Sequence, residues 1–269
     1  MPDELLTVQR ALDVLALFST DRPDWGVTEV AAELGLAKSQ AHRLLTTLAG
    51  RSYVVVDPRT RSYRLGPALI GLGQVASRSD GTRQLALPVL RRLAATSGHS
   101  AQLNVYDGPQ YVLAAAAQSP SELQYEFTVG RRYPWYGGAA GHAIYAFRDP
   151  AEIQSFLALG FTQSAERGAH TPEELLARHA ATRLRGWAHS AGEFDPRTAA
   201  VGAPVRAAGQ VVASVIVIAA VQALEPDLDR MGAEVVRAAA ELSDVFSTGR
   251  AVEALPPNSS PNVPPRGQP

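Results

Sequence analysis

The chain has 269 residues, of which 46% are hydrophobic and 19% charged, and its formal net charge is −1. This composition is typical of a folded globular protein and excludes a disordered or collagen-like chain, and the length favours two domains. The sequence has no cysteine, which excludes disulfide frameworks, thiol catalysis and cysteine-ligated metal centres. The six histidines are scattered singly, without a metal-binding spacing, so we expect no metal and no cofactor.

The first 50 residues predict three helices. Apolar residues recur at three- and four-residue steps over residues 5–18, which is the period of one buried helix face. A short second helix is expected to begin at an N-cap at Thr28 and to end at Gly35. Residues 37–48 resume a helical pattern, with polar side chains on the arc opposite the apolar one.

After Gly50 the pattern becomes that of strands. Residues 53–57 are β-branched and extended, residues 58–61 form a turn, and residues 62–66 are again strand-like. Three helices followed by a hairpin within about 65 residues are the outline of a winged helix-turn-helix.

Cationic residues gather in this part of a nearly neutral chain. Six arginines and lysines lie between positions 38 and 64, against the single acid Asp57. In a helix-turn-helix the second helix enters the major groove, where Gln40 and Arg43 have the forked geometry that reads base edges. Each residue alone also fits an ordinary solvated surface, and the order of the elements favours DNA binding. The residues predicted to contact DNA are Thr28, Lys38, Ser39, Gln40, His42, Arg43, Thr46, Arg59, Arg61 and Arg64.

The remainder of the chain predicts a mixed domain with strands and helices. Residues 67–82 form an amphipathic connector, and the next helix is expected to be broken or bent at Pro88. Thr171, followed by Pro172, is the expected cap of a later helix. Further elements are expected as strands at 101–108 and 110–117, a strand block at 201–221 and a final helix at 228–246. The last residues, 251–269, are rich in Pro, Ser and Asn and predict a disordered tail.

Targeting and nucleotide motifs are weak. The N-terminus carries acids where a signal peptide needs basic residues, and the most apolar stretch, 211–224, is shorter than a membrane span. We therefore expect a cytoplasmic protein without membrane contact.

The string GLGQVA at 71–76 matches the sequence of a dinucleotide-binding fingerprint, but it follows a hairpin and lacks the strand that such a site needs.

Several runs resemble the IclR (isocitrate lyase regulator) family of bacterial transcription factors. They are TVQRALDVLALF, VTEVAAELGLAKSQAHRLLTTL, YVVVDPRTRSYRLG, GGAAGHAIYAF, RGWAHSAGEFDPRTAAVGAPV and GQVVASVIVI, and the resemblance covers residue 5 to about 247. It implies an α+β fold with a winged helix-turn-helix, a connector helix and a GAF-like effector domain. It also implies a homodimer or a dimer of dimers that controls genes by repression or activation, modulated by a small-molecule effector. Of the two modes we expect repression, with the dimer on an inverted-repeat operator in double-stranded DNA. The implied division is 1–66, 67–82, 83–250 and the tail 251–269.

The resemblance also implies an effector site, beneath the loop matching Gly138–Gly141. Two aromatic residues beside that loop are either flat walls of the site or ordinary core residues. Family members often have polar residues where this chain has Ala200, Ile216 and Ile218, and often a lysine at His142. Loss of those polar partners favours an apolar or aromatic effector. The implied effector residues are Trp135, Tyr136, Gly138, Ala139, Ala140, Gly141, Ser190, Ala200, Ile216 and Ile218.

The competing interpretation is an enzyme or a signalling module with a helical appendage. In that interpretation Glu193 and Asp195 act as acid and base beside His189. Carboxylates in loops are common, and we expect Glu193 to order a loop backbone instead. A salt-sensitive, sequence-selective DNA mobility shift separates the two interpretations.

Overall fold

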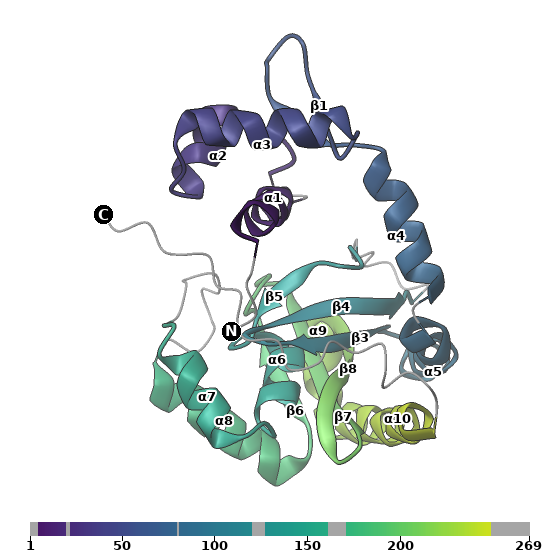
Figure 1. The fold of residues 1–269 in the computed structure, drawn as a ribbon. Coiled ribbons are helices and arrows are strands. Elements are labelled where there is room, and N and C mark those ends of the chain that lie inside the picture. The colour runs from purple at the N-terminus through teal and green to yellow at the C-terminus, as the bar shows by residue number, and fades with distance from the viewer. Residues whose placement is uncertain (1–4, 20–21, 80, 120–126, 161–170, 249–269) are drawn as a thin grey trace. The chain divides into compact units, whose positions relative to one another are not determined.

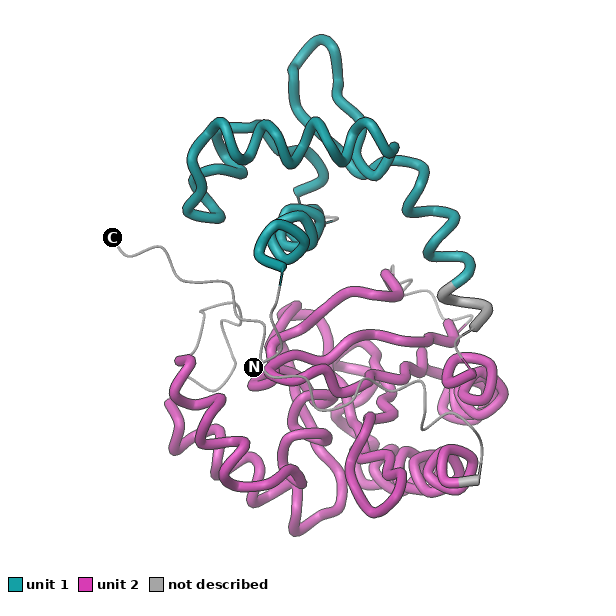
Figure 2. The backbone as a smooth tube through the Cα atoms, in the orientation of Figure 1, with its two compact units in different colours: residues 1–79, 262–269 teal, residues 80–261 magenta. Residues whose placement is uncertain are grey.

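The computed structural model describes residues 5–19, 22–79, 81–119, 127–160 and 171–248. The chain divides into two compact units between residues 79 and 80, which Figure 2 draws in different colours. Each unit contains its own hydrophobic core. None of the described helices combines the length and apolarity needed to cross a bilayer. The predicted tail, 251–269, lies outside the described residues.

Unit 1 has the predicted order of helices and hairpin (Figure 1). Helices α1 and α2 both pack on α3, and Val14, Val30 and Leu45 are fully buried in this core together with Val54 of the hairpin. The elements of this unit are α1 (Leu6–Ala16), α2 (Val27–Glu33), α3 (Lys38–Gly50), β1 (Val54–Val56), β2 (Tyr63–Leu65) and α4 (Ala68–Ser79).

The start of α2 differs from the prediction. The N-cap is Gly26, whose backbone N–H donates to Glu29 Oε2 at 2.7 Å. A carboxylate three residues into a helix can reach back to the cap in this way. The predicted cap, Thr28, is instead an exposed residue of the first turn.

The hairpin is fixed at its tip and at its base. At the tip, Asp57 Oδ1 accepts from the backbone of Arg59 at 2.8 Å, and the Asp57 carbonyl accepts from Arg61 at 2.8 Å. At the base, Trp25 and Tyr63 exchange two backbone hydrogen bonds of 2.9 and 2.8 Å. The base of the hairpin is therefore hydrogen-bonded to the segment that precedes α2.

Unit 2 is built on a six-stranded antiparallel sheet, so the fold is α+β. Its strand order is β5-β4-β3-β8-β7-β6. The hairpin turns contain Gly108 and Gly209, whose φ values of 63° and 78° suit glycine. The strands are β3 (Ser100–Asp107), β4 (Gln110–Ala117), β5 (Arg132–Pro134), β6 (Ala188–Ala191), β7 (Thr198–Ala207) and β8 (Gln210–Ala220).

Helices cover both faces of this sheet (Figure 1). One face packs on α5 (Gly81–Ser97) and α10 (Leu228–Thr248), with Leu90, Val215, Met231, Leu242 and Phe246 in the core between them. The other face packs on α6, behind which lie α7 and α8. The remaining elements are α6 (Gly138–Tyr145), α7 (Pro150–Leu157), α8 (Pro172–Arg185), α9 (Val221–Leu224) and the 3₁₀ turn η1 (Glu225–Asp227).

Two predicted helix details have opposite outcomes. Helix α5 runs without a break through Pro88, so of the two predicted alternatives, a break or a bend, the break is wrong. The cap of α8 is confirmed, because Thr171 Oγ1 accepts from Glu174 N at 3.2 Å and Pro172 follows it. At the other end of α8, Gly186 adopts a φ of 80° that ends the helix.

Candidate functional site

The first candidate surface lies on α3, whose polar arc faces solvent. The apolar side chains of α3, Ala41 and Leu45, are fully buried against α1 and α2. The helical period then turns the remaining positions outward. The exposed residues on this surface are Lys38, Ser39, Gln40, His42, Arg43 and Thr46.

The hairpin extends the cationic surface. Arg59 and Arg61 lie at its tip and Arg64 on β2, and all three are exposed, as is Thr28 on α2. Within the described residues, none of these arginines, nor Lys38 or Arg43, forms an ion pair, so each cation is free to meet an external phosphate or base edge. The ion pair nearest in sequence, Arg22 with Glu29, precedes α3.

The second candidate site lies at the N-terminal end of α6. Gly138, Ala139, Ala140 and Gly141, predicted as a loop, form the first turn of this helix instead. Gly138 has a φ of 72°, and a Cβ there would lie 2.7 Å from the Phe194 ring. The positive φ favours glycine at this position, and the close approach of the Phe194 ring adds to that preference.

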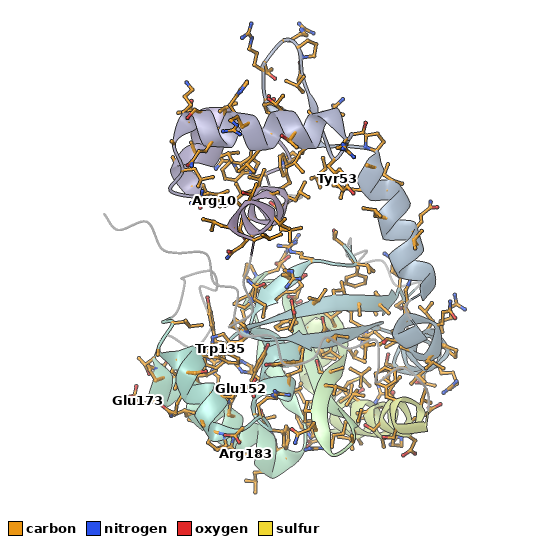
Figure 3. The ribbon with its side chains drawn as sticks, viewed as in Figure 1. Arg10, Tyr53, Trp135, Glu152, Glu173 and Arg183 are labelled. Carbon is orange, nitrogen blue, oxygen red and sulfur yellow. The ribbon has the colours of Figure 1, made fainter. Side chains whose placement is uncertain are left out.

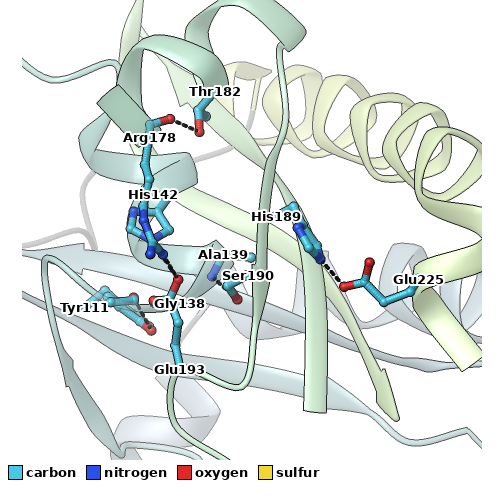
Figure 4. Close-up of polar contacts among 11 residues, drawn as sticks. Tyr111, Gly138, Ala139, His142, Arg178, Thr182, His189, Ser190, Glu193 and Glu225 are labelled. Carbon is cyan, nitrogen blue, oxygen red and sulfur yellow. Dashed lines mark hydrogen bonds and ion pairs between the residues drawn. The ribbon is translucent and has the colours of Figure 1, made fainter. Parts of the chain in front are cut away.

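A buried carboxylate holds this helix start (Figure 4). Glu193 Oε2 accepts from Gly138 N at 2.7 Å, and Oε1 lies 3.2 Å from His142 Nε2 and 2.5 Å from Arg178 Nη1. Burial raises the pKa of Glu193, but the hydrogen bond from His142, together with Gly138 and Arg178, outweighs it and leaves the pKa below its ordinary value. Glu193 is thus an ionised cap. It was predicted to order a loop backbone, and the backbone that it orders is the first turn of a helix.

Ser190 caps the next residue of the same turn. Its Oγ accepts from Ala139 N at 2.8 Å. Ser190 stands opposite Ala200, which stands opposite Ile218, so the three form one row across β6, β7 and β8. Ile216 lies two residues along β8 and is buried on the same face.

The predicted aromatic residues belong to the core. Trp135 and Tyr136 are 2% and 5% exposed, and the Trp135 ring packs against Tyr145, Phe156 and His179. They share one cluster with most of the other predicted effector residues. These are Ala139, Ala140, Ala200 and Ile216, with the half-buried Ile218 packed against them.

Sequence reasoning missed buried polar residues on β3 and β8. Asn104 is 1% exposed and Ser214 is 0% exposed, and the two stand opposite each other on β3 and β8. Asn104 Nδ2 and Ser214 Oγ have no hydrogen-bond partner among the described residues. Gln102, opposite Ile216, is buried on the same face. The available signal was the spacing of Gln102 and Asn104, two residues apart within an apolar strand.

The acid–base arrangement of the enzyme interpretation is not assembled. His189 Nε2 lies 2.9 Å from Glu225, whereas Asp195 binds Arg197. Glu193 instead contacts His142 and Arg178 through its carboxylate. No group of three or more histidine and carboxylate side chains that could hold a metal ion occurs in the part of the chain that the structure describes.

Two family models match the chain in turn. The model of the IclR helix-turn-helix domain matches residues 7–58, and that of the bacterial transcriptional regulator IclR C-terminal domain matches residues 74–244. The chain belongs to the IclR family. It is therefore a helix-turn-helix transcriptional regulator and not an enzyme.

Similar regulators cover most of the chain. It is 28% identical over 239 residues to the regulator BhcR of Paracoccus denitrificans, which covers 88% of this chain and 85% of that protein. A glycerol operon regulatory protein of Streptomyces griseus is 30% identical over 84% of this chain and 89% of its own length. A solved IclR regulator from Alicyclobacillus acidocaldarius has a TM-score of 0.78 at 27% identity, covering 91% of this chain and all of that one.

Proposed function

We propose that this IclR regulator is a repressor that binds an inverted repeat in double-stranded DNA as a homodimer, alone or within a dimer of dimers. Residues 1–66 are its DNA-binding domain, 67–82 its connector and 83–250 its effector domain. The observation that carries the proposal is the α3 surface, where exposed hydrogen-bonding side chains include two cations, Lys38 and Arg43, that form no ion pair with described residues.

Residues on this surface divide by the contacts that their chemistry allows. Gln40 and Arg43 lie in the N-terminal half of α3 and carry the forks that bind adenine and guanine edges. Thr28, Lys38, Ser39, His42 and Thr46 are placed to bind phosphates beside them. The hairpin residues Arg59, Arg61 and Arg64 add contacts to the flanking backbone.

A second copy of the chain accounts for an exposed apolar stripe on α1. Leu5 is 74% exposed, Val8 53% and Leu12 59%, and their spacing places them on one side of the helix. Apolar side chains that face water do not stabilise a monomer, whereas two copies of the chain can bury each other's stripes. The resulting dimer presents two α3 helices, as an inverted repeat requires.

The effector of this chain is apolar or aromatic. The row of Ala200 and Ile218 beside Ile216 gives it a largely apolar floor, and the first-turn amides of α6 are already occupied by Glu193 and Ser190. A second carboxylate directed at that turn would face the one of Glu193. The unpartnered Asn104 and Ser214 offer hydrogen bonds to a polar group farther along the sheet.

A solved relative supports a small aromatic ligand for this fold. An IclR homologue from Microbacterium hydrocarbonoxydans was crystallised with 4-hydroxybenzoate, and it matches this chain with a TM-score of 0.69 at 21% identity. A ring of that size suits an apolar floor. Its carboxylate, which would face Glu193 at the first turn of α6, suits the hydrogen-bond donors of Asn104 and Ser214 instead.

Fluorescence anisotropy with the DNA upstream of the chain's own coding region tests DNA binding. Arg43→Ala should weaken specific binding by about 1–3 kcal/mol, because a bidentate base contact is lost. The matched control is Arg237→Ala, which removes the same charge from an exposed position on α10 and should leave the affinity unchanged. Equal affinity and equal base preference in the Arg43→Ala variant and the parent would remove α3 as the reading helix.

A further inference from the structure

A cavity lies at the opposite end of α6 from the proposed effector site. Its volume is about 490 Å³, within the range of small-molecule sites. It opens between the turn after α6, helices α7 and α8, and strand β7. None of the residues assigned to the effector site lines it. Its walls include Phe147, Ile153, Leu176, His179, Arg183 and Arg206.

Two of the three arginines in its wall have no carboxylate partner among the described residues. Arg148 is neutralised, because its Nε and Nη2 bind Glu152 at 2.7 and 3.0 Å. Arg183 instead donates to the carbonyl of Ala146 at 2.8 Å (Figure 3 labels Arg183 and Glu152). Arg206 has its guanidinium carbon 5.1 Å from the centre of the Phe147 ring. Neither Arg183 nor Arg206 pairs with a carboxylate of the described residues.

Most of the remaining wall is apolar, and it also contains Gln154 and one buried polar atom without a partner among the described residues. Ile153 and Phe147 belong to the core behind α6, and Leu176 borders them. His179 is 1% exposed, and its Nε2 has no hydrogen-bond partner among the described residues. Burial, with smaller effects of His142 and Arg183, lowers the pKa of His179 to about 3. The ring is therefore neutral near pH 7 and adds a hydrogen-bonding group without adding charge.

We propose that this cavity is a second ligand site, which binds a small organic carboxylate with an aromatic or short aliphatic body. The carboxylate lies between Arg183 and Arg206, and the body lies on Ile153 and Leu176. Forked guanidinium groups bind carboxylates well, and an apolar wall beside them selects an acid that has an apolar body over acetate or an inorganic anion.

Calorimetric titration of the full chain with benzoate and with hexanoate tests this site. Benzyl alcohol, which has the ring without the charge, is the ligand control. Arg206→Ala should weaken acid binding at one site by about tenfold, because a close charge pair is lost. Arg237→Ala, with the same loss of charge on the opposite face of the sheet, should not change it.

Two substitutions at one exposed residue of the wall, one adding a negative and one a positive charge, should change acid affinity in opposite directions. Misfolding would not produce opposite changes. Gln154 is exposed on α7 and lines the cavity. Gln154→Glu should weaken binding of benzoate several-fold and Gln154→Lys should strengthen it, whereas benzyl alcohol should respond to neither. Circular dichroism checks that each variant is folded.

Three outcomes would overturn the proposal. The first is that neither acid binds. The second is that the acids bind with affinities that Arg206→Ala and both Gln154 variants leave unchanged, while Ile218→Ser changes them, which would place all binding at the effector site. The third is that Arg206→Ala alters the sedimentation coefficient, which would make this face a contact between copies of the chain.

Discussion

Replacing Glu193 by glutamine should destabilise unit 2 far more than its small chemical change suggests. The carboxylate is 4% exposed and has three donors around it, on Gly138, His142 and Arg178. Glutamine keeps one acceptor oxygen but turns an amide NH₂ toward groups that also donate. The substitution removes the charge that made those hydrogen bonds strong and leaves at least one buried donor unpaired.

The magnitude follows from these partners. Hydrogen bonds to a charged group are worth about 1.5–3 kcal/mol each, and an unpaired buried donor costs about 1–3 kcal/mol. Arg178 has a side chain that is 38% exposed, so water compensates for part of its loss. We expect Glu193→Gln to lower the free energy of unfolding at pH 7 by about 2–4 kcal/mol.

The pH dependence gives a second, independent signature. Because the pKa of Glu193 is lowered on folding, its contribution is complete above the ordinary value of 4.5 and is lost as the pH falls through the folded-state value. The stability difference between the parent and Glu193→Gln should therefore shrink in acid. Comparing the two proteins subtracts what other titrating groups contribute.

Urea unfolding followed by circular dichroism between pH 3 and pH 8 measures both effects. The matched control is Glu173→Gln, which makes the same change on the exposed surface of α8 and should stay within about 0.5 kcal/mol of the parent. An unfolding free energy of Glu193→Gln equal to that of the parent at pH 7, with the same slope in acid, would refute the assignment of Glu193 as an ionised cap.

Three further predictions concern other parts of the molecule. Gly66→Ala should unfold the hairpin and abolish DNA binding, because its Cβ would lie 2.2 Å from the backbone oxygen of Ser52; wild-type affinity measured by anisotropy would contradict this. Leu12→Glu should shift sedimentation from dimer toward monomer, and an unchanged sedimentation coefficient would argue against α1 as the contact. Ile218→Ser should change which aromatic acids raise the melting temperature in a thermal-shift panel, because it adds a hydroxyl to the apolar row; identical profiles would count against this pocket.

The parts of the fold that sequence reasoning predicted well are those determined by local patterns. The buried arc of α3 follows from Ala41 and Leu45 at helical spacing, and the cap of α8 follows from Thr171 beside Pro172. Thr28 was wrong as a cap for a local reason as well, because Glu29 could serve Gly26 one turn earlier. Competing caps within three residues of each other cannot be ranked from residue type alone.

The effector site was harder to predict because its determinants are distant in the sequence. The run from Gly138 to Gly141 has glycines at both ends and no capping side chain of its own, which favours a loop. It forms a helical turn because Glu193 and Ser190, more than 50 residues away, bind its first two amides. The row of Ser190, Ala200 and Ile218 likewise exists only once the strand register is known.

Helix α6 links the two proposed ligand sites because both of its ends are hydrogen-bonded to α8, one through Glu193 and the other directly. Its first turn is held by Glu193, which also binds Arg178 on α8, while the carbonyl of Ala146 at its other end is held by Arg183 on α8. The helix is buried along its whole length, so it cannot shift at one end without displacing packed side chains at the other. A carboxylate that draws Arg183 away from Ala146 would therefore change the setting of the first turn, and ligand affinities at the two sites would be coupled reciprocally.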